Sequence, residues 1–188
     1  MTRLLEKLNS LQNANSQLVD QISQMFVYKF FKKGLLLSTP DHSYPEIYFI
    51  EDGLIRGYFL HEGVEYTSWI LQSGFVLPTT SFFSKSRSIE YIDFLKDSSG
   101  YAINLKHWLD QGKFNSALLF LLLELYEENL QKIKLREQML RIRHAETRFL
   151  FFKELFPELI NLPIHKILAS MLAIESKYLF TIKRKYRL

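Results

Sequence analysis

The sequence predicts an α+β protein in which an N-terminal β-sandwich or jelly-roll barrel, flanked by helices, is followed by one long helix and a helical C-terminal domain. Three observations lead to this fold. Between residues 26 and 95, short runs rich in phenylalanine, tyrosine and isoleucine alternate with turn residues, which favours a sandwich or barrel. A helical period then runs from about Phe114 to about Arg143, and two short helical segments follow later. We expect domains at residues 1–112, 113–143 and 144–188.

The N-terminal domain begins with a helical stretch over residues 1–25. Leu4 and Leu8 share one face there, and Asn15 or Ser16 can cap a second helix. The strands that we expect after this stretch are Val27–Phe31, Leu35–Leu37, Ile47–Ile50, Leu54–Leu60, Tyr66–Leu71 and Ile89–Leu95.

Two connections in this domain carry local signals. Asp52-Gly53 lies between two apolar runs and predicts a β-hairpin, because a primed turn needs positive φ, which glycine adopts without strain. Farther along, Leu105–Gln111 is expected to form a short helix, and Gly112 separates it from the long helix.

The long helix has an apolar seam that suits a second helix. Seven apolar residues run from Ala117 to Leu123, and seam positions recur at spacings of four and three, with Glu137 interrupting the last heptad. Further leucines in its first half indicate that this half is covered on a second side. We interpret it as a dimerisation helix about 45 Å long, with the core helix of a monomer as the alternative. The seam residues are Leu119, Leu123, Tyr126, Leu130, Ile133 and Leu140.

Composition and charge narrow the class of protein. The chain has 188 residues, 47% of them hydrophobic, which is enough to bury a core. Residues 1–130 carry 11 Lys and Arg against 15 Asp and Glu, whereas residues 131–188 carry 13 against 5. The net charges are therefore −4 and +8. This asymmetry favours a polyanion-binding module attached to an acidic domain, and a solvated basic surface is the alternative.

Several classes of function are excluded or disfavoured. The absence of cysteine excludes disulfides, thiolate zinc sites, cysteine-bound iron–sulfur clusters and thiol nucleophiles. The five histidines show no metal-ligand spacing, and no nucleophile motif or phosphate loop is present. We therefore expect no metal, no cofactor and no enzyme activity. The polar N-terminus and the lack of an apolar run of about 18 residues predict a cytoplasmic protein with no membrane contact.

The C-terminal domain contains a candidate helix-turn-helix. The helical period resumes after Arg143, and Asn161-Leu-Pro163 marks a boundary. Two short helices then follow at Ile164–Leu172 and at Ser176 to about Tyr186, with three residues between them. Ala169 allows the two helices to cross closely. This arrangement is typical of a helix-turn-helix, although plain helical packing gives the same pattern.

The outer face of the last helix carries the predicted contacts to double-stranded DNA. If Leu179 and Ile182 point into the core, the side chains roughly 100° to 200° away face outward, where a major groove could receive them. Lys183 and Arg187 are expected near phosphates. The predicted DNA-binding residues are Lys166, Ser176, Lys177, Phe180, Thr181, Arg184 and Lys185.

Four stretches combine with this order of elements to indicate a family. They are Tyr48-Phe-Ile-Glu-Asp-Gly-Leu-Ile-Arg-Gly-Tyr58, Ala145-Glu-Thr-Arg-Phe149, Phe156-Pro-Glu-Leu159 and Ile167-Leu-Ala-Ser-Met-Leu-Ala-Ile174. The combination resembles the Crp/Fnr superfamily of bacterial transcription regulators, in particular its short members common in Bacteroidetes. The likeness covers roughly residues 25–185. It implies a cyclic-nucleotide-binding-like sensor domain, a homodimer, DNA as a partner and RNA polymerase as a possible second one.

The sequence departs from this family in its helix-turn-helix. Ala173 stands where the family has glycine, which would cost about 1 kcal/mol if the left-handed conformation is kept. Ser176-Lys177-Tyr178 and Phe180-Thr181 stand where the family has Pro-Glu-Thr and Ser-Arg, so the glutamate and arginine that commonly read bases are replaced. An exposed Phe180 could touch a thymine methyl group or pack on a partner.

The resemblance also implies where an effector would bind. Nucleotide-responsive members hold the ribose with Gly-Glu and the cyclic phosphate with Arg-Ser or Arg-Ala, because a buried phosphate needs a fixed positive charge and aligned donors. The segment from Gly74 to Ile89 has no Gly-Glu, and its Arg87-Ser88 pair is out of register. We therefore expect no cyclic nucleotide, keep Arg87 and Ser88 as effector-binding candidates, and leave an unknown small-molecule effector open.

The leading hypothesis is a dimeric regulator whose recognition helices lie about 34 Å apart. A second hypothesis is a degenerate family member that keeps the dimer and a ligand pocket but acts through a protein partner. A third, a metal-dependent jelly-roll enzyme, is disfavoured because only His61 and Glu65 could contribute ligands.

Overall fold

The computed structural model describes most of the chain, and the described residues form two compact units. The described residues are 1–41, 46–78, 88–104 and 116–187. Unit 1 consists of Met1–Phe59 and Trp69–Glu128, and unit 2 consists of Leu60–Ser68 and Asn129–Leu188. Arg87, Phe114 and the helix expected over Leu105–Gln111 lie outside the described residues.

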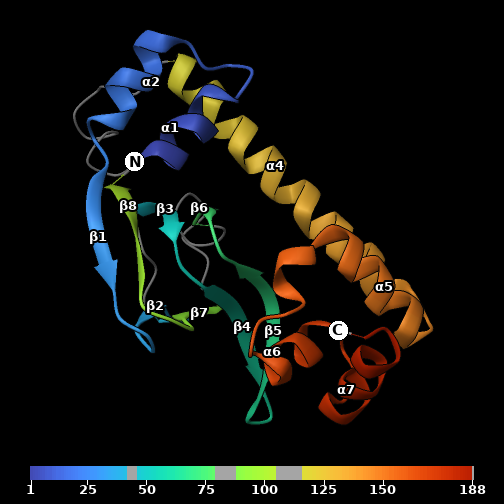
Figure 1. The fold of residues 1–188 in the computed structure, drawn as a ribbon. Coiled ribbons are helices and arrows are strands. Elements are labelled where there is room, and N and C mark those ends of the chain that lie inside the picture. The colour runs from blue at the N-terminus through green and yellow to red at the C-terminus, as the bar shows by residue number, and fades with distance from the viewer. Residues whose placement is uncertain (42–45, 79–87, 105–115, 188) are drawn as a thin grey trace. The chain divides into compact units, whose positions relative to one another are not determined.

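Two N-terminal helices and two antiparallel sheets make up most of unit 1 (Figure 1). The helices are α1 (Thr2–Asn9) and α2 (Ser16–Ser23). The strands are β1 (Val27–Phe31), β2 (Leu36–Ser38), β3 (Glu46–Asp52), β4 (Ile55–His61), β5 (Val64–Leu71), β6 (Gly74–Val76), β7 (Tyr91–Phe94) and β8 (Ser98–Asn104). The ends of β4 and β5 that meet in their hairpin belong to unit 2.

The sandwich was predicted correctly, and the barrel was not. The strand orders are β1-β8-β3-β6 and β2-β7-β4-β5, and no described strand belongs to both sheets. A barrel requires hydrogen bonding that continues around a closed sheet. Here the chain passes from one sheet to the other between β3 and β4, so the hydrogen-bonded ladder is interrupted at that point and the sheets stay separate.

The hairpin predicted at Asp52-Gly53 is wrong for the same reason, because β3 and β4 lie in different sheets. Gly53 does not have positive φ. Its small size is needed instead, since a Cβ at position 53 would lie 2.7 Å from the Ile50 side chain and from Ser98 Oγ. Positive φ occurs at Glu62 and Gly63, where the β4–β5 hairpin turns.

All the expected strands are present, but β6 and β8 were missed. Strand β8 lies in the interior of its sheet, between β1 and β3, although it begins Ser98-Ser99-Gly100, residues that seldom mark strands. A Cβ at Gly100 would lie 2.2 Å from the carbonyl oxygen of Phe49. Glycine is therefore required at this position, because the neighbouring backbones approach each other closely. Since glycine is uncommon in strands, the sequence pattern did not indicate a strand here.

Unit 1 has one core between the sheets and a second core on the outer face of the β1-β8-β3-β6 sheet. Between the sheets, Phe31 and Phe94 stack with ring centroids 4.4 Å apart. On the outer face, leucines from α1 and from the first half of α4 (Ser116–Arg141) pack on β3 and β8. This packing confirms that the first half of the long helix is covered on a second side. Its buried leucines are Leu118, Leu121, Leu122 and Leu125.

Unit 2 contains the rest of α4 and the C-terminal helices. These are α5 (Ala145–Leu155), the 3-10 helix η1 (Pro157–Leu159), α6 (His165–Met171) and α7 (Ser176–Lys185). Phe149 and Phe152 of α5 are buried, and Ala169 is buried where α6 meets α7. The predicted helix-turn-helix is therefore present, with each helix beginning and ending within two residues of its expected bounds.

Candidate nucleic-acid interface

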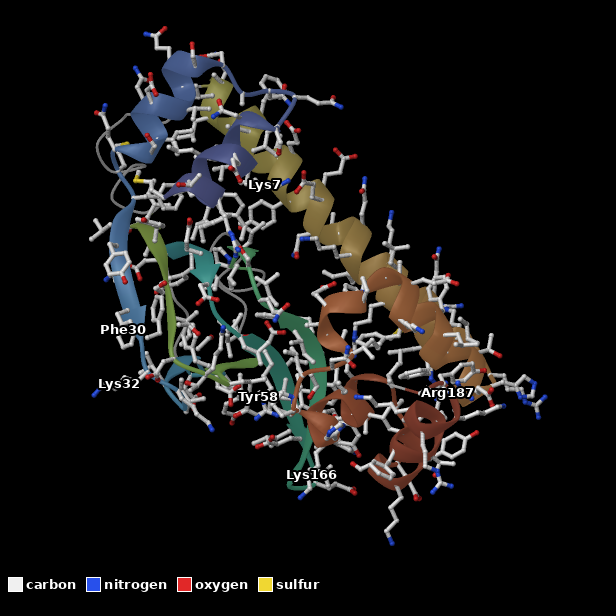
Figure 2. The ribbon with its side chains drawn as sticks, viewed as in Figure 1. Lys7, Phe30, Lys32, Tyr58, Lys166 and Arg187 are labelled. Carbon is white, nitrogen blue, oxygen red and sulfur yellow. The ribbon has the colours of Figure 1, made fainter. Side chains whose placement is uncertain are left out.

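The outer face of α7 carries most of the residues predicted at DNA. Leu179 and Ile182 are buried, as expected for the side that faces the core. Phe180 is 63% exposed. Figure 2 labels Lys166 of α6, which is exposed as well. The other exposed residues of the predicted set are Ser176, Lys177, Thr181, Arg184 and Lys185. All seven predicted residues therefore lie on the surface of unit 2.

Lys183, which was expected to be available to phosphates, is instead buried in unit 2. It is 6% exposed, and its Nζ donates to the carbonyl oxygen of Ile160 at 2.5 Å. Burial lowers the pKa of Lys183, because the ammonium group loses hydration in the interior. Helical geometry explains the position, since Lys183 follows Ile182 on the inner side of α7. Lys183 is a packing residue of unit 2.

Lys185 forms an ion pair within unit 2. Its Nζ lies 2.6 Å from Oε1 of Glu146, and the Tyr186 hydroxyl donates to the same oxygen. Hydrogen bonds from Lys185 and Tyr186 lower the pKa of Glu146, and the carboxylate in turn raises the pKa of Lys185. The Lys185 side chain is 62% exposed. A bound phosphate would therefore compete with Glu146 for one ammonium group.

The turn between α6 and α7 keeps the left-handed conformation without the glycine. Ala173 has a φ of 51°. The N–H of Ile174 donates to the carbonyl oxygen of Ala169 at 3.0 Å, and the N–H of Ala173 donates to that of Ser170 at 3.1 Å. This pair of hydrogen bonds is a Schellman motif, which usually places glycine at the left-handed position. The turn geometry is thus retained at the steric cost expected for alanine.

Arg148 supports this turn, a role that the sequence analysis missed. Its Nη1 donates to the carbonyl oxygen of Ile142 at 2.9 Å, and its Nη2 donates to that of Ala173 at 3.1 Å. One guanidinium therefore joins the residues that follow α4 to the turn of the helix-turn-helix. The available signal was the position of Arg148 inside the Ala145–Phe149 stretch, where an arginine precedes an apolar run.

The β4–β5 hairpin contacts α6 within unit 2. Ser170 Oγ accepts a hydrogen bond from the Thr67 N–H at 2.9 Å and donates one to the carbonyl oxygen of Glu65 at 3.2 Å. Arg136 of α4 donates to the Thr67 carbonyl oxygen at 3.0 Å. Thr67 and Ser170 are 103 residues apart in the sequence, so no local pattern indicates this contact. The strand-rich segment thus contributes its hairpin to the unit that holds the helix-turn-helix.

Most of the predicted seam on α4 is exposed in the single chain. Leu119, Leu123, Leu130 and Ile133 are between 43% and 55% exposed. Tyr126 differs, because its hydroxyl donates to the carbonyl oxygen of Pro78 at 2.9 Å and burial raises its pKa to about 12. Leu140 is half-buried. The exposed leucines and isoleucine form an apolar stripe that nothing in the described part of one chain covers.

Trp69 and Glu90 occupy the space beside Gly57 in the sandwich, and the backbone of Glu90 contacts the effector-binding candidate Ser88. The Trp69 indole lies against Gly57, since a Cβ at that position would be 2.3 Å from Trp69 Nε1. The same Nε1 donates to Oε1 of Glu90 at 2.7 Å. Ser88 is buried, and its Oγ accepts a hydrogen bond from the Glu90 N–H at 3.0 Å. Glu90 thus contacts Ser88 through its backbone and Trp69 through its carboxylate, whereas Arg87 lies outside the described residues.

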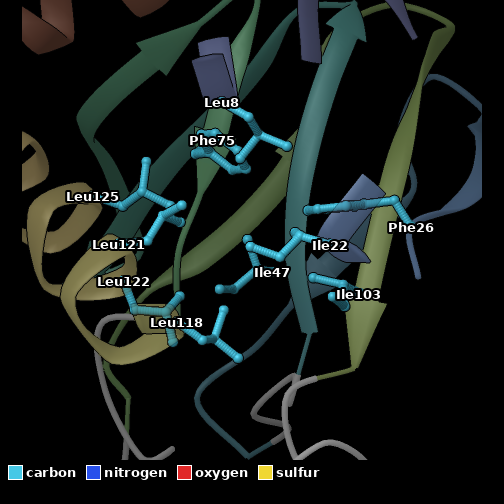
Figure 3. Close-up of a pocket in the computed structure, with 10 residues that line it drawn as sticks. All are labelled: Leu8, Ile22, Phe26, Ile47, Phe75, Ile103, Leu118, Leu121, Leu122 and Leu125. Carbon is cyan, nitrogen blue, oxygen red and sulfur yellow. The ribbon is translucent and has the colours of Figure 1, made fainter. Parts of the chain in front are cut away.

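A cavity of about 20 Å³ lies in the outer core of unit 1 (Figure 3). Figure 3 shows four leucines of α4 facing Ile47 and Ile103 across this space. A volume of this order holds roughly one water molecule, and the cavity has no polar lining to bind it. It cannot accept a nucleotide. The lining residues are Leu8, Ile22, Phe26, Ile47, Phe75, Ile103, Leu118, Leu121, Leu122 and Leu125.

Neither a metal site nor a membrane span is found within the described ranges. No group of three or more histidine, aspartate or glutamate side chains there could hold a metal ion, so His61 and Glu65 are not joined by a third ligand. Among the described helices, none is long and apolar enough to pass through a bilayer.

A two-sheet antiparallel sandwich, a long helix and a basic helix-turn-helix together define the fold of Crp/Fnr-type regulators. Solved structures confirm this fold. FixK2 from Bradyrhizobium japonicum matches with a TM-score of 0.73 at 12% identity, covering 86% of this chain and 84% of that one. A CooA mutant from Carboxydothermus hydrogenoformans matches at 0.66 and 17% identity, covering 98% and 84%. No protein-family model and no curated protein matches the chain.

A third structure carries the family description itself. A protein from Eubacterium rectale, described as a transcriptional regulator of the Crp/Fnr family, matches with a TM-score of 0.67 at 18% identity. The match covers 93% of this chain and 84% of that one. The chain thus has the Crp/Fnr fold over nearly its whole length, as the sequence resemblance implied.

Proposed function

We propose that this protein is a dimeric, DNA-binding transcription regulator of the Crp/Fnr type rather than an enzyme. The outer face of α7 carries the proposal, because Lys177, Thr181 and Arg184 are exposed together on one side of a helix whose other side is buried. The left-handed turn before α7 and the net charge of +8 on residues 131–188 support the same function. A protein of this kind would act in the cytoplasm, where the DNA is.

The homodimer is proposed from the stripe on α4. Leu119, Leu123, Leu130 and Ile133 recur at helix-packing spacing and are exposed to solvent in the single chain. Phe120, beside them, is 56% exposed. A second copy of the helix would remove this apolar surface from water and hold two basic helix-turn-helix domains on one particle.

The effector, if one is used, is proposed not to be a cyclic nucleotide. The Glu90 carboxylate accepts a hydrogen bond from Trp69 Nε1 beside Gly57, so a negative charge already occupies that place and would repel an anionic phosphate brought there. Trp69 takes up further space inside the sandwich. The prediction is that titration of cyclic AMP into the protein produces no heat of binding in calorimetry, and a micromolar dissociation constant would contradict it.

Selection of bound DNA from a random duplex pool at two salt concentrations tests the function directly. A regulator would enrich one sequence with twofold symmetry, because two identical recognition helices read two half-sites. Enrichment without sequence preference would indicate phosphate binding alone. An absence of binding at the lower salt concentration would contradict the proposal.

Two lysine variants, with a third as control, distinguish a proposed contact to a base from a proposed contact to a phosphate. Lys177→Ala should relax sequence preference at one position of each half-site, because its side chain is proposed to reach a base edge. Lys185→Ala should weaken binding to all DNA sequences alike. It should also reduce the salt dependence of the binding constant by about one released counterion per subunit. Lys132→Ala on α4 is the control and should change neither property.

A further inference from the structure

We propose that Phe180 contacts the C5-methyl group of a thymine, so that each half-site of the recognised DNA contains one thymine that this protein requires. The inference rests on the proposed DNA-binding function and adds a base-reading contact to it. It starts from the position of Phe180 on α7, which follows from the helical period. Lys177, Phe180, Thr181 and Arg184 fall within an arc of about 100°.

This arc is the exposed side of α7. The opposite side holds Leu179, Ile182 and Lys183, all buried. Phe180 is therefore not needed for the core of unit 2, and among the described residues it forms no ring contact. Solvent exposure of much of a phenyl ring forgoes the free energy that its burial would supply. The ring lies between cationic neighbours, so the surface that would cover it is expected to be anionic and to carry an apolar group.

Thr181 makes this part of the arc more apolar. Its Oγ1 donates to the carbonyl oxygen of Lys177 at 3.1 Å, one helical turn earlier. The hydroxyl is thereby committed to the backbone, and the methyl group remains for contact with a partner. Phe180 and the Thr181 methyl group lie at the two edges of the arc, with Lys177 and Arg184 between them. Phosphate contacts alone would not need these apolar groups.

The chemistry of the major groove supplies one match for an exposed phenyl ring next to these cations. Its base edges are hydrogen-bond donors and acceptors, and the apolar group among them is the thymine methyl. Lys177 and Arg184 would pair with guanine or with phosphates, whereas a phenyl ring can do neither. The arc therefore predicts a thymine next to the bases or phosphates that these two cations contact.

The test uses the full chain and the duplex that it enriches from a random pool. Each thymine is replaced in turn by deoxyuridine, which removes the methyl group and preserves base pairing. One replacement per half-site should weaken binding by about fourfold, the effect of one buried methyl group. Phe180→Ala should bind the thymine duplex more weakly and show no further loss with deoxyuridine at that position.

Tyr178→Ala is the matched control. Tyr178 is also an exposed aromatic residue of α7, at 45%, but it lies about 100° from Lys177 and outside the arc. Binding of this variant should still weaken when the thymine is replaced by deoxyuridine, as in the wild type. Phe180→Leu should keep part of it, because an apolar side chain remains. Thermal unfolding of each variant shows whether the fold is intact, which is expected at an exposed position.

Three results would overturn the inference while leaving DNA binding in place, and two of them come from the deoxyuridine replacements. In one, no deoxyuridine replacement weakens the wild type. In the other, Phe180→Ala retains the same sensitivity to deoxyuridine as the wild type. If the wild type enriches no sequence, the proposed function fails and the inference fails with it. If Phe180→Ala binds DNA as well as the wild type does, the ring serves a different partner.

Discussion

Nη2 of Arg148 donates to the carbonyl oxygen of Ala173 at 3.1 Å, and this hydrogen bond joins α5 to the turn of the helix-turn-helix. The same guanidinium donates to the carbonyl oxygen of Ile142 at 2.9 Å. A planar guanidinium offers several donors at fixed angles, so one side chain can serve two segments. Lysine has a single ammonium group and cannot reproduce this geometry.

Arg148→Lys should therefore destabilise the protein by about 1–2 kcal/mol, because at least one partly buried carbonyl loses its donor. Urea unfolding followed by circular dichroism measures the change. Arg141→Lys is the control, since Arg141 is exposed and pairs with Glu137 on the surface of α4. Its effect should stay within about 0.5 kcal/mol. Equal losses in the two variants would contradict the role of Arg148.

Ala173→Gly should stabilise the protein by about 0.5 kcal/mol. Relief of the left-handed strain is worth about 1–2 kcal/mol, and the extra freedom of glycine in the unfolded chain offsets part of it. Ala117→Gly on α4 is the control and should destabilise by about 1 kcal/mol, since it lies in a right-handed helix. Thermal unfolding measures both changes. A melting temperature of Ala173→Gly below that of the wild type would contradict the presence of backbone strain at Ala173.

Ser170→Ala should free the hairpin from α6. The hydroxyl is the acceptor for the Thr67 N–H, and Thr67 is 1% exposed, so the variant leaves a buried donor unpaired. The expected cost is about 1–3 kcal/mol. Hydrogen exchange at the Thr67 amide should accelerate. Ser176→Ala, at an exposed residue of α7, should leave this exchange rate unchanged, and a protected Thr67 amide in Ser170→Ala would refute the contact.

Leu123→Glu and Leu130→Glu should convert the proposed dimer to a monomer. Each places a carboxylate in an apolar seam, where burial of an unpaired charge costs several kcal/mol. Sedimentation at micromolar concentration measures the mass. Leu36→Glu, at an exposed leucine of β2, is the control that should remain dimeric. A wild type that sediments as a monomer would refute the seam itself.

Lys183→Met removes a buried cation and also removes the donor to the Ile160 carbonyl oxygen, so its two effects on stability at neutral pH oppose each other and the pH dependence is the test. The folded pKa of Lys183 lies below its ordinary value of 10.5. Between these two values the unfolded chain binds more protons, so the stability of the wild type rises with pH. In urea unfolding, the wild type should therefore gain stability relative to the variant as pH rises from the folded pKa toward 10.5. Lys177→Met, at an exposed lysine, should show no such trend.

Features with a local signal were predicted well. The N-cap at Asn15 is an example, because its side chain accepts a hydrogen bond from the Leu18 N–H at 2.9 Å, a contact that spans three residues. The outward side of α7 is another, since helical period alone separates Lys177 from Leu179. The prediction for Lys183 was wrong although the helical period of α7 would have given the right result. Lys183 lies on the same inner side of the helix as Ile182.

Features that depend on distant residues were missed or mistaken. Gly53 was interpreted as part of a hairpin turn. Glycine is needed there because a larger side chain would collide with Ser98, which is 45 positions later in the sequence. Strand β8 was not predicted because glycine at position 100 is required by the close approach of the Phe49 backbone, and this requirement leaves no local sequence pattern. The contact of Ser170 with Thr67 had no sequence signal at all.

The sequence alone determined that a strand-rich region, a long helix and a helix-turn-helix follow one another, and it determined the apolar stripe of α4 and the concentration of basic charge after residue 130. Periodicity, caps and charge are properties of neighbouring residues, so they can be recognised without a structure. Only the tertiary structure decided that two open sheets form instead of a barrel, that the hairpin joins unit 2, and that Arg148 holds the turn. Those outcomes depend on contacts between segments far apart in the chain, which leave no periodic trace in the sequence.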